Sequence, residues 1–221
     1  MTRFAPRMWL PEAAIMTMPA SLSSVTIRKA RPSDETAILD ICVRTSDRGK
    51  DGSQYYSDPR LPGLLWALPY VRFCAETAFV LTKGDVVMGY CVAAPDTIAY
   101  ENWLEAAWWP SLLEELRDFE TRTVEDENVL SYIRSARKTP AEVTRPYPAH
   151  LHINLLPEIQ NGGHGSSLLR HQLDSLTRSD VRGVHLGVNQ YNEKVVAFYA
   201  KFGFVEIDRT PSIVMAKRLT E

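Results

Sequence analysis

A glycine-rich turn between an expected strand and an amphipathic helix constrains this chain more than any other feature. The strand is expected over AHLHINLL (149–156), the turn is NGGHG (161–165), and the helix after it carries Leu169, Leu173 and Leu176 at helical spacing. Such a turn directs unpaired backbone N–H groups and the positive end of the helix dipole at one point. Glycines also let a bulky anion approach the backbone closely. The sequence therefore predicts an anion site, above all a phosphate site, at the start of this helix.

Strand and helix patterns alternate along the rest of the chain. Runs with period two predict strands at 25–30, 78–94 (a hairpin), 149–156, 184–189, 204–207 and 213–219. Runs with helical spacing predict helices at 35–44, 64–75 and 192–202, and the second of these is expected to be kinked or to start near Pro69. A helical insertion is expected at about 100–140, where it carries three tryptophans, and a long loop at 47–63. The fold class is therefore α/β with one mixed sheet.

The composition is that of a protein with a packed core and little net charge. The chain has 25 Lys and Arg residues and 27 Asp and Glu residues, so its net charge is −2. This balance argues against a nucleic-acid binder, and no stretch approaches the ~18 apolar residues of a membrane span. We expect residues 1–24 to form a flexible tail and residues 25–221 to form a single domain, located in the cytoplasm.

The three cysteines give no sign of a metal site. Cys42, Cys74 and Cys91 are odd in number and widely spaced, and they match no zinc or redox motif. Buried thiols in a reducing cytosol are the expected reading. No metal site is predicted.

Three kinds of phosphate-binding loop compete for the glycine-rich turn. A Walker loop needs a lysine after its glycines, and none follows here. A Rossmann fingerprint needs a glycine or alanine where Leu168 stands. The pattern Gln/Arg-x-x-Gly-x-Gly/Ala is present as Gln160, Gly163 and Gly165. A simple tight turn between strand and helix is the alternative to any phosphate site.

A second motif follows the turn after one helix and one strand. The run NEKVVAFYAKFGF (192–204) resembles the Asn…Ala…Phe-Tyr-x-Lys-x-Gly-Phe signature of the GNAT superfamily of N-acetyltransferases. The two motifs in this order make the resemblance specific, and it covers residues 25–219. It implies the GNAT fold, with a mixed, mostly antiparallel central sheet that is splayed at the fourth and fifth strands. Helices are expected on both faces, and the helical insertion lies between strands three and four.

A narrower resemblance is carried by three further runs. IRKARPSDETAILDIC (27–42), GYCVAAPD (89–96) and YPAHLHINL (147–155), with the Trp-rich insertion, are similar to the acetyltransferase-like C-terminal domain of O-GlcNAcase and its stand-alone bacterial relatives. Some members of that group lack the phosphate loop and are regarded as non-catalytic. This chain has the loop, which favours acyl-CoA binding.

The resemblance implies that acetyl-CoA binds between the splayed strands 149–156 and 184–189. In that arrangement the first strand pairs with the pantetheine amides and the turn holds the pyrophosphate. Lys194, Arg170 or Lys201 would meet the 3′-phosphate. The residues expected to contact acetyl-CoA are Leu155, Leu156, Gln160, Asn161, Gly162, Gly163, His164, Gly165, Ser166, Asn192, Phe198 and Tyr199.

The implied reaction is direct attack of an amine on the thioester within a ternary complex. A lysine-type amine has a pKa near 10.4, so it needs a base or a desolvating pocket at pH 7. Tyr199 is expected to be the catalytic acid that protonates the departing thiolate, because family members place a tyrosine hydroxyl beside the sulfur. Ordinary packing on an amphipathic helix is the alternative role for Tyr199.

The sequence indicates the base that accepts the amine's proton less clearly than it indicates the acid. Many family members use a glutamate at the position of Ala149, which has no ionisable group. His150 and His152 lie on the opposite pleat and are expected to be structural. Asp96 matches an acidic position of the O-GlcNAcase-like domain and is the predicted catalytic carboxylate. The alternatives are Glu101, Asp58 and a chain of water molecules.

The sequence thus predicts an acetyl-CoA-dependent N-acetyltransferase that acts on a small amine or a peptide as a monomer or homodimer. No nucleic-acid or membrane partner is expected. A non-catalytic acyl-CoA-binding or protein-interaction module is the alternative, and Ala149 favours it. The Trp-rich insertion has two interpretations, a helical pair packed over one end of the sheet or a lid over the acceptor pocket.

Overall fold

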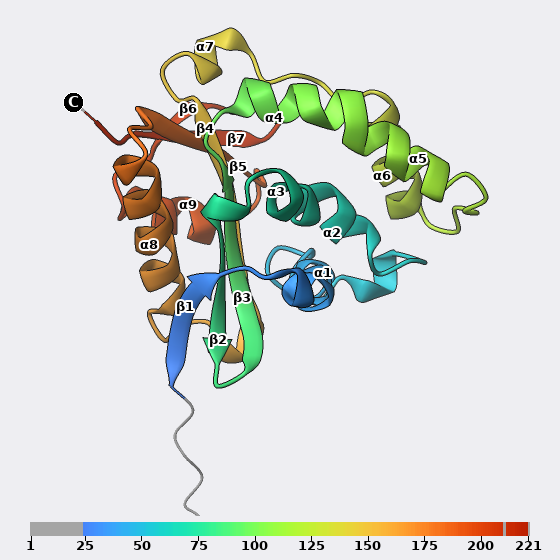
Figure 1. The fold of residues 1–221 in the computed structure, drawn as a ribbon, viewed down its shortest axis with the longest axis horizontal. Helices are drawn as coiled ribbons and strands as arrows, with labels where there is room; N and C mark the ends of the chain where they lie inside the picture. The colour runs from blue at the N-terminus through green and yellow to red at the C-terminus, as the bar shows by residue number, and fades with distance from the viewer. Residues whose placement is uncertain (1–23, 210, 221) are drawn as a thin grey trace, which may run out of the picture.

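The computed structural model describes residues 24–209 and 211–220. Seven strands of this part form one sheet in the order β1-β2-β3-β4-β5-β7-β6 (Figure 1). All neighbouring strands are antiparallel except β4 and β5, which are parallel. The strands are β1 Val25–Lys29, β2 Ala78–Lys83, β3 Val86–Ala94, β4 Ala149–Leu155, β5 Gly183–Val188, β6 Val205–Asp208 and β7 Ile213–Arg218. The expected α/β fold with a mixed, mostly antiparallel sheet is confirmed, whereas the expected tail lies outside the described residues apart from Ser24.

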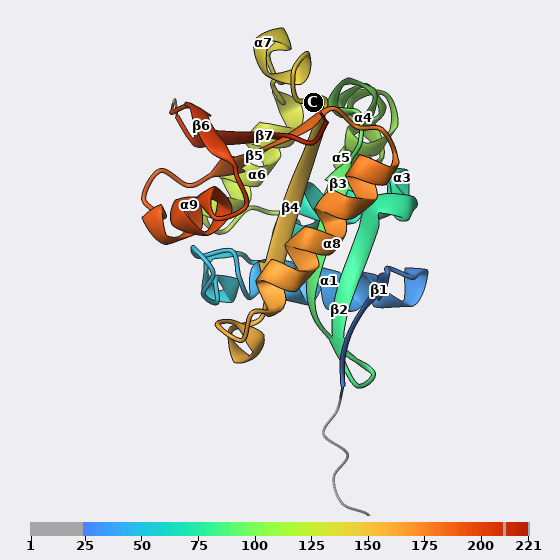
Figure 2. The same cartoon turned by 90° about the vertical axis from the view of Figure 1, so that its left-hand side faces the viewer.

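Helices cover both faces of the sheet (Figures 1 and 2). One face is covered by α8 (His164–Arg178) and α9 (Glu193–Ala200). The other face is covered by α1 (Glu35–Val43), α2 (Leu61–Trp66) and α3 (Leu68–Phe73). Short 3₁₀ turns occur at Pro32–Asp34, Ser53–Tyr55, Ala75–Thr77 and Pro157–Ile159. No helix of the described residues is long and apolar enough to cross a membrane.

The central strands are buried on both faces because side chains alternate along them. In β2, Ala78 and Val80 point into the core that contains α1–α3, whereas Phe79 and Leu81 point into the core that contains α8 and α9. Helix α8 adds Leu168, Leu169, Leu173 and Leu176 to the second core. Alternate side chains of the strands thus pack against the apolar faces of the helices on the two sides of the sheet.

The parallel pair β4 and β5 stays together over a very short length. Only Ala149 pairs with Val184 and His150 with His185, whereas β5 remains paired with β7 along all six of its residues. Beyond His150, β4 runs on to Leu155 without a strand on its β5 side. Figure 2 shows β5 and β7 turning away from β4 at this point. The splay expected between the fourth and fifth strands is present.

The helical insertion lies between β3 and β4, as expected. It consists of α4 (Thr97–Trp103), a π-helical turn (Leu104–Trp108), α5 (Trp109–Glu115), α6 (Val124–Arg134) and α7 (Ala141–Thr144). Trp109, Leu112, Leu130 and Ile133 join the core that contains α1–α3. The insertion is thus an extension of this core, and its tryptophans serve partly as packing residues.

The helix expected over 64–75 is two helices with a break at Ala67. The dihedral angles of Ala67, φ −133° and ψ −58°, are not helical. Proline at position 69 has no N–H to donate, and its ring clashes with the carbonyl four residues earlier in a continuous helix. The first of the two helices begins at Leu61 because Pro62 fits the first turn of a helix.

A buried aspartate ties the loop at 47–60 to the insertion. The carboxylate of Asp126 accepts hydrogen bonds from the amide and hydroxyl of Ser57 and from the amides of Arg122 and Thr123. Burial acts to raise the pKa of Asp126, and the hydrogen bonds outweigh burial, so the pKa lies below the ordinary 3.8. The ionised carboxylate therefore stabilises the fold above that value.

We expect Asp126→Ala to lower the free energy of unfolding by about 3 kcal/mol at pH 7, because several buried donors lose their acceptor. Asp118→Ala removes a carboxylate on a side chain that is 94% exposed and should change stability little. Urea unfolding of both variants measures the difference. Folding lowers the pKa of Asp126. The difference in free energy of unfolding between the native chain and Asp126→Asn should therefore shrink as the pH falls below about 4. Equal stability of the two alanine variants would contradict this role.

Candidate active site

Three residues of β4 turn their peptide groups toward the splay. Leu156 N donates to Met88 O at 2.9 Å, so the even-numbered residues of this segment bond to β3. Backbone groups alternate in direction along an antiparallel pair. Leu151, Ile153 and Leu155 therefore direct their N–H and C=O groups to the β5 side of the strand. The pairing of His150 with His185 uses the N–H of Leu151, and Gln160 Nε2 donates to Leu155 O. The C=O of Leu151, both groups of Ile153 and the N–H of Leu155 are left for a ligand. An extended ligand with amide groups could pair with this edge as an added strand.

The turn at the end of β4 adopts the conformation that an anion site needs. Asn161 and Gly163 have left-handed φ angles of 62° and 79°. The first amide of α8 with a backbone acceptor is Ser167 N, which bonds Gly163 O at 3.1 Å. Among the described residues, the amides of His164, Gly165 and Ser166 have no acceptor. Three N–H groups at a helix N-terminus thus remain to bind an anion.

Helix α9 meets this turn through an aromatic ring. A Cβ placed on Gly165 would lie 3.7 Å from Leu155 Cδ1 and 3.9 Å from Phe198 Cζ. Residues predicted from two separate motifs therefore come together across the end of the splay. Asn192 precedes α9, and its side chain makes no hydrogen bond within the described part of the chain.

Tyr199 is buried on the α8 side of the sheet. Its side chain is 6% exposed, and its ring lies 5.2 Å from that of Phe198 and 5.4 Å from that of Phe204. Burial raises the pKa of the Tyr199 hydroxyl above its usual range, and Cys91 adds to this effect. The hydroxyl therefore keeps its proton at neutral pH, as a proton donor must.

Gln160 contacts the protein's own backbone. Its Nε2 donates to Leu155 O at 2.8 Å and to Gly49 O at 3.4 Å. Nearby, Arg44 and Glu158 form an ion pair at 2.9 Å. Gln160 was expected to contact the coenzyme, and its side chain here connects the turn to the loop at 47–60. The sequence pattern gave no sign of the contact with Gly49, which is 111 residues away.

Two predicted site residues lie away from the splay. The N–H of Leu156 bonds to β3, its C=O accepts from Ile159 N at 3.0 Å, and its side chain is 5% exposed in the core. Leu156 therefore has no group directed at the splay. Asp96 is exposed, and its Oδ1 accepts from Ala99 N at 3.0 Å as the N-cap of α4. It lies at the closed end of the splay, where Ala94 pairs with His150.

The other carboxylates considered as bases are also engaged. Glu101 accepts hydrogen bonds from the amide and hydroxyl of Thr139, at 3.0 and 2.6 Å. Asp58 forms an ion pair with Arg60 at 2.7 Å. Both carboxylates thus serve as acceptors for neighbouring groups of the protein.

The two histidines of β4 differ in their surroundings. Nδ1 of His150 lies 2.8 Å from Thr97 Oγ1, and that hydroxyl donates to Pro148 O at 2.7 Å. This network agrees with the expected structural role. His152 is partly exposed and makes no hydrogen bond with any described residue. No hydrogen bond therefore supports the structural role that was expected for His152.

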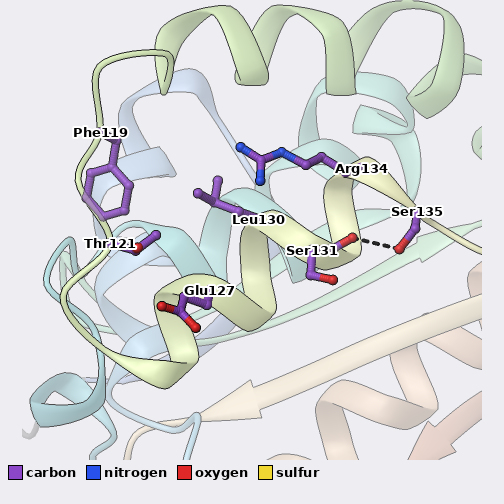
Figure 3. Close-up of a pocket in the computed structure, with 7 residues that line it drawn as sticks. All are labelled: Phe119, Thr121, Glu127, Leu130, Ser131, Arg134 and Ser135. Atoms are coloured by element: carbon purple, nitrogen blue, oxygen red, sulfur yellow. Dashed lines mark hydrogen bonds between the residues drawn. The ribbon is translucent and has the colours of Figure 1, made fainter.

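A hollow of about 400 Å³ lies in the insertion, away from these residues (Figure 3). It is lined by Phe119, Thr121, Glu127, Leu130, Ser131, Arg134 and Ser135. All of these come from α6 and the segments beside it, and none comes from β4, α8 or α9. No group of three or more His, Cys, Asp or Glu residues within the described ranges is arranged to hold a metal ion.

Comparison with known proteins identifies the family. The sequence model of the GNAT acetyltransferase family matches residues 37–204. This chain belongs to the GNAT family. Its paired motifs, splayed sheet and mostly antiparallel strand order are those of the family, and the resemblance drawn from the sequence is confirmed.

Individual relatives extend this result. The crystal structure of SsHAT is similar over 90% of this chain and 100% of that chain, with a TM-score of 0.82 and 34% identity. Protein O-GlcNAcase of Rattus norvegicus is 24% identical over 185 residues, which are 82% of this chain and 20% of that protein. The chain thus spans about a fifth of the length of O-GlcNAcase. The structure of yncA from Salmonella typhimurium with acetyl-CoA shares the fold, with a TM-score of 0.55 and 15% identity.

We expect the three thiols to react slowly with Ellman's reagent in the folded protein. Burial raises the pKa of Cys42 and of Cys74 to about 12, and it raises that of Cys91 further. Thiolates are the reactive species, so few are present at pH 8. The folded chain should release far less than one equivalent of chromophore in minutes, and the unfolded chain three. Cys42 and Cys91 are buried and Cys74 is partly buried, so two or more fast equivalents from the folded chain would contradict the burial of the first two.

Proposed function

We propose that this chain is an acetyl-CoA-dependent N-acetyltransferase that moves the acetyl group from the thioester to an amine by direct attack in a ternary complex. The splay between β4 and β5 carries the proposal, because it joins a free strand edge to an anion-binding turn. Family membership supports acetyl transfer in general. The similarity to SsHAT supports the same arrangement over nearly the whole chain.

Different backbone groups of the chain would bind different parts of the coenzyme. The C=O of Leu151, the N–H and C=O of Ile153 and the N–H of Leu155 would bond the pantetheine amides. The amides of His164, Gly165 and Ser166 would hold the pyrophosphate, where the helix dipole favours negative charge. The bound acetyl thioester supplies the electrophilic carbon for the reaction.

Tyr199 would act as the proton donor. When the amine nitrogen bonds to the acetyl carbon, the C–S bond breaks and the sulfur leaves as a thiolate. The nitrogen loses one proton to a base, and the thiolate gains one, for which the protonated hydroxyl of Tyr199 is suited. Asp96 has no part in this scheme, because its carboxylate caps α4 at the closed end of the splay.

The binding part of the proposal is tested with two glycines of equal backbone strain. Gly163 and Gly203 have φ angles of 79° and 80°, so an alanine at either position costs about 1–2 kcal/mol of stability. Only Gly163 lies in the turn. We expect Gly163→Ala to weaken acetyl-CoA binding about tenfold or more in isothermal titration calorimetry, and Gly203→Ala to leave it within about twofold. Equal affinities in two folded variants would remove the turn from the site.

The chemical part is tested by Tyr199→Phe. Removal of the hydroxyl should lower kcat by about 100-fold, the lower end of the range for general acids, with acetyl-CoA affinity nearly unchanged. Release of the free thiol during turnover measures the rate. Tyr191→Phe is a matched control, because Tyr191 is 74% exposed. An unchanged rate for Tyr199→Phe would exclude this acid, and tight coenzyme binding without thiol release would favour a non-catalytic binding module.

A further inference from the structure

The face of β4 opposite α8 carries a histidine at the start of the splay. His150, His152 and Asn154 point to the side of the sheet covered by α1–α3, because side chains alternate along the strand. His150 is the last residue paired with β5, so His152 is the first of the three beyond the pairing. Its imidazole therefore lies beside the opening, on the side away from α8 and Tyr199.

The hydrogen bonds of the neighbouring histidines set His152 apart. Nδ1 of His150 lies 2.8 Å from Thr97 Oγ1, and Nδ1 of His185 lies 2.8 Å from Tyr147 O. His152 has no such partner in the described part of the chain. A partly exposed imidazole without a partner, at the opening of a candidate active site, is suited to bind a ligand.

Aromatic side chains from three helices surround this imidazole. The ring of His152 lies 5.4 Å from that of Tyr70 in α3 and 6.0 Å from that of Trp66 in α2. Tyr132 of α6 packs edge-on against Trp66 at 4.9 Å and is 40% exposed. We call Trp66 and Tyr132 the aromatic wall, and the buried Tyr70 packs behind it. The insertion thus contributes a tyrosine to this region, whereas Trp108 packs inward and donates to Leu64 O at 3.1 Å.

Few titratable groups lie near His152, and the carboxylate among them, Glu101, already accepts hydrogen bonds from Thr139. The titratable groups that face His152 are His150 and His185, and Tyr70 packs against its ring. Glu101 lies near Tyr70 and Tyr132, and its carboxylate is bonded to Thr139. Burial lowers the pKa of His152 to about 4, with a smaller contribution from His185, so its ring is neutral at pH 7. A neutral ring nitrogen can accept a hydrogen bond from an amine.

We propose that His152 binds the amine nitrogen of the acceptor, and that the acceptor is a primary amine carried on an aromatic or apolar body that packs against the aromatic wall. This inference rests on the proposed function and names its acceptor site. The N–C bond forms as the C–S bond breaks. The amine reacts in its neutral form, and the proton that its nitrogen then loses passes to the free ring nitrogen of His152 and on to solvent. The sulfur takes its proton from Tyr199, and the Tyr199 hydroxyl is reprotonated from solvent. A polyamine fits less well, because no unpaired carboxylate among the described residues faces His152.

The acceptor class is tested with three probe amines at equal concentration: 2-phenylethylamine, spermidine and a lysine peptide. Thiol release with acetyl-CoA should give the highest kcat/KM for 2-phenylethylamine. A higher value for spermidine or the peptide would overturn the acceptor class and leave the proposed function standing. Absence of acetyl-CoA binding in calorimetry would overturn the proposed function and this inference with it.

The role of His152 is tested with His152→Gln and a matched control, His171→Gln, on α8. His152→Gln should lower kcat/KM for 2-phenylethylamine at least tenfold, about 1.4 kcal/mol, with acetyl-CoA affinity within about twofold. The control should resemble the native chain. Thermal unfolding checks that each variant is folded. An unaltered kcat/KM in His152→Gln would overturn the role of the imidazole.

Two further measurements do not depend on turnover. In the native chain saturated with coenzyme A, adding 2-phenylethylamine should shift the ¹⁵N resonances of the His152 ring and leave those of His171 in place. Tyr132→Ala removes an exposed part of the aromatic wall and should weaken binding of this amine about threefold to tenfold. Unmoved His152 resonances, or unchanged amine affinity in Tyr132→Ala, would contradict the acceptor site.

Discussion

A strand that loses its neighbour partway along its length leaves peptide groups that need another partner. β4 does this after His150, and the rest of the candidate site depends on it. β5 keeps its pairing with β7 and turns away, so the sheet divides into β1–β4 on one side and β5, β7 and β6 on the other. The exposed edge of β4 then leads directly to the turn at the start of α8. A continuous β4–β5 ladder would satisfy the same peptide groups and leave no open strand edge.

The two faces of the splay have different chemistry. On the α8 side lie the free amides of the turn, the ring of Phe198 and the buried Tyr199. On the α1–α3 side lie His152 and the aromatic wall. The loop at 47–60 connects the two, because Gly49 accepts from Gln160 and Ser57 bonds to Asp126 of the insertion. The insertion thereby supports both the wall and the loop.

Local patterns predicted the elements that depend on local physics. The glycine-rich turn, the helix after it and the left-handed Gly203 that follows α9 agree with turn chemistry and helical spacing. The splay itself came from the resemblance to a family, because no spacing within β4 marks the residue at which β5 departs. The coarse fold was therefore predictable from the sequence.

Long-range contacts decided what the sequence could not predict. His150 and His152 share a pleat and look equivalent in the sequence, and only the approach of Thr97 and Pro148 to His150 separates them. Leu156 continues the apolar run of β4, yet its backbone bonds to Met88 and Ile159. Asp96 matches an acidic position of relatives, and the start of α4 at Thr97 makes it a helix cap. Each outcome depends on a contact with a distant segment or on an element boundary.

Amide hydrogen exchange with and without acetyl-CoA tests the central claim most directly. Bound coenzyme should slow exchange at the amides of Ile153 and Leu155 and at those of His164, Gly165 and Ser166. The amides of His152 and Asn154, which already bond to β3, should change far less. Protection confined to the hollow around Phe119 and Arg134, with no change along β4 or the turn, would contradict the account.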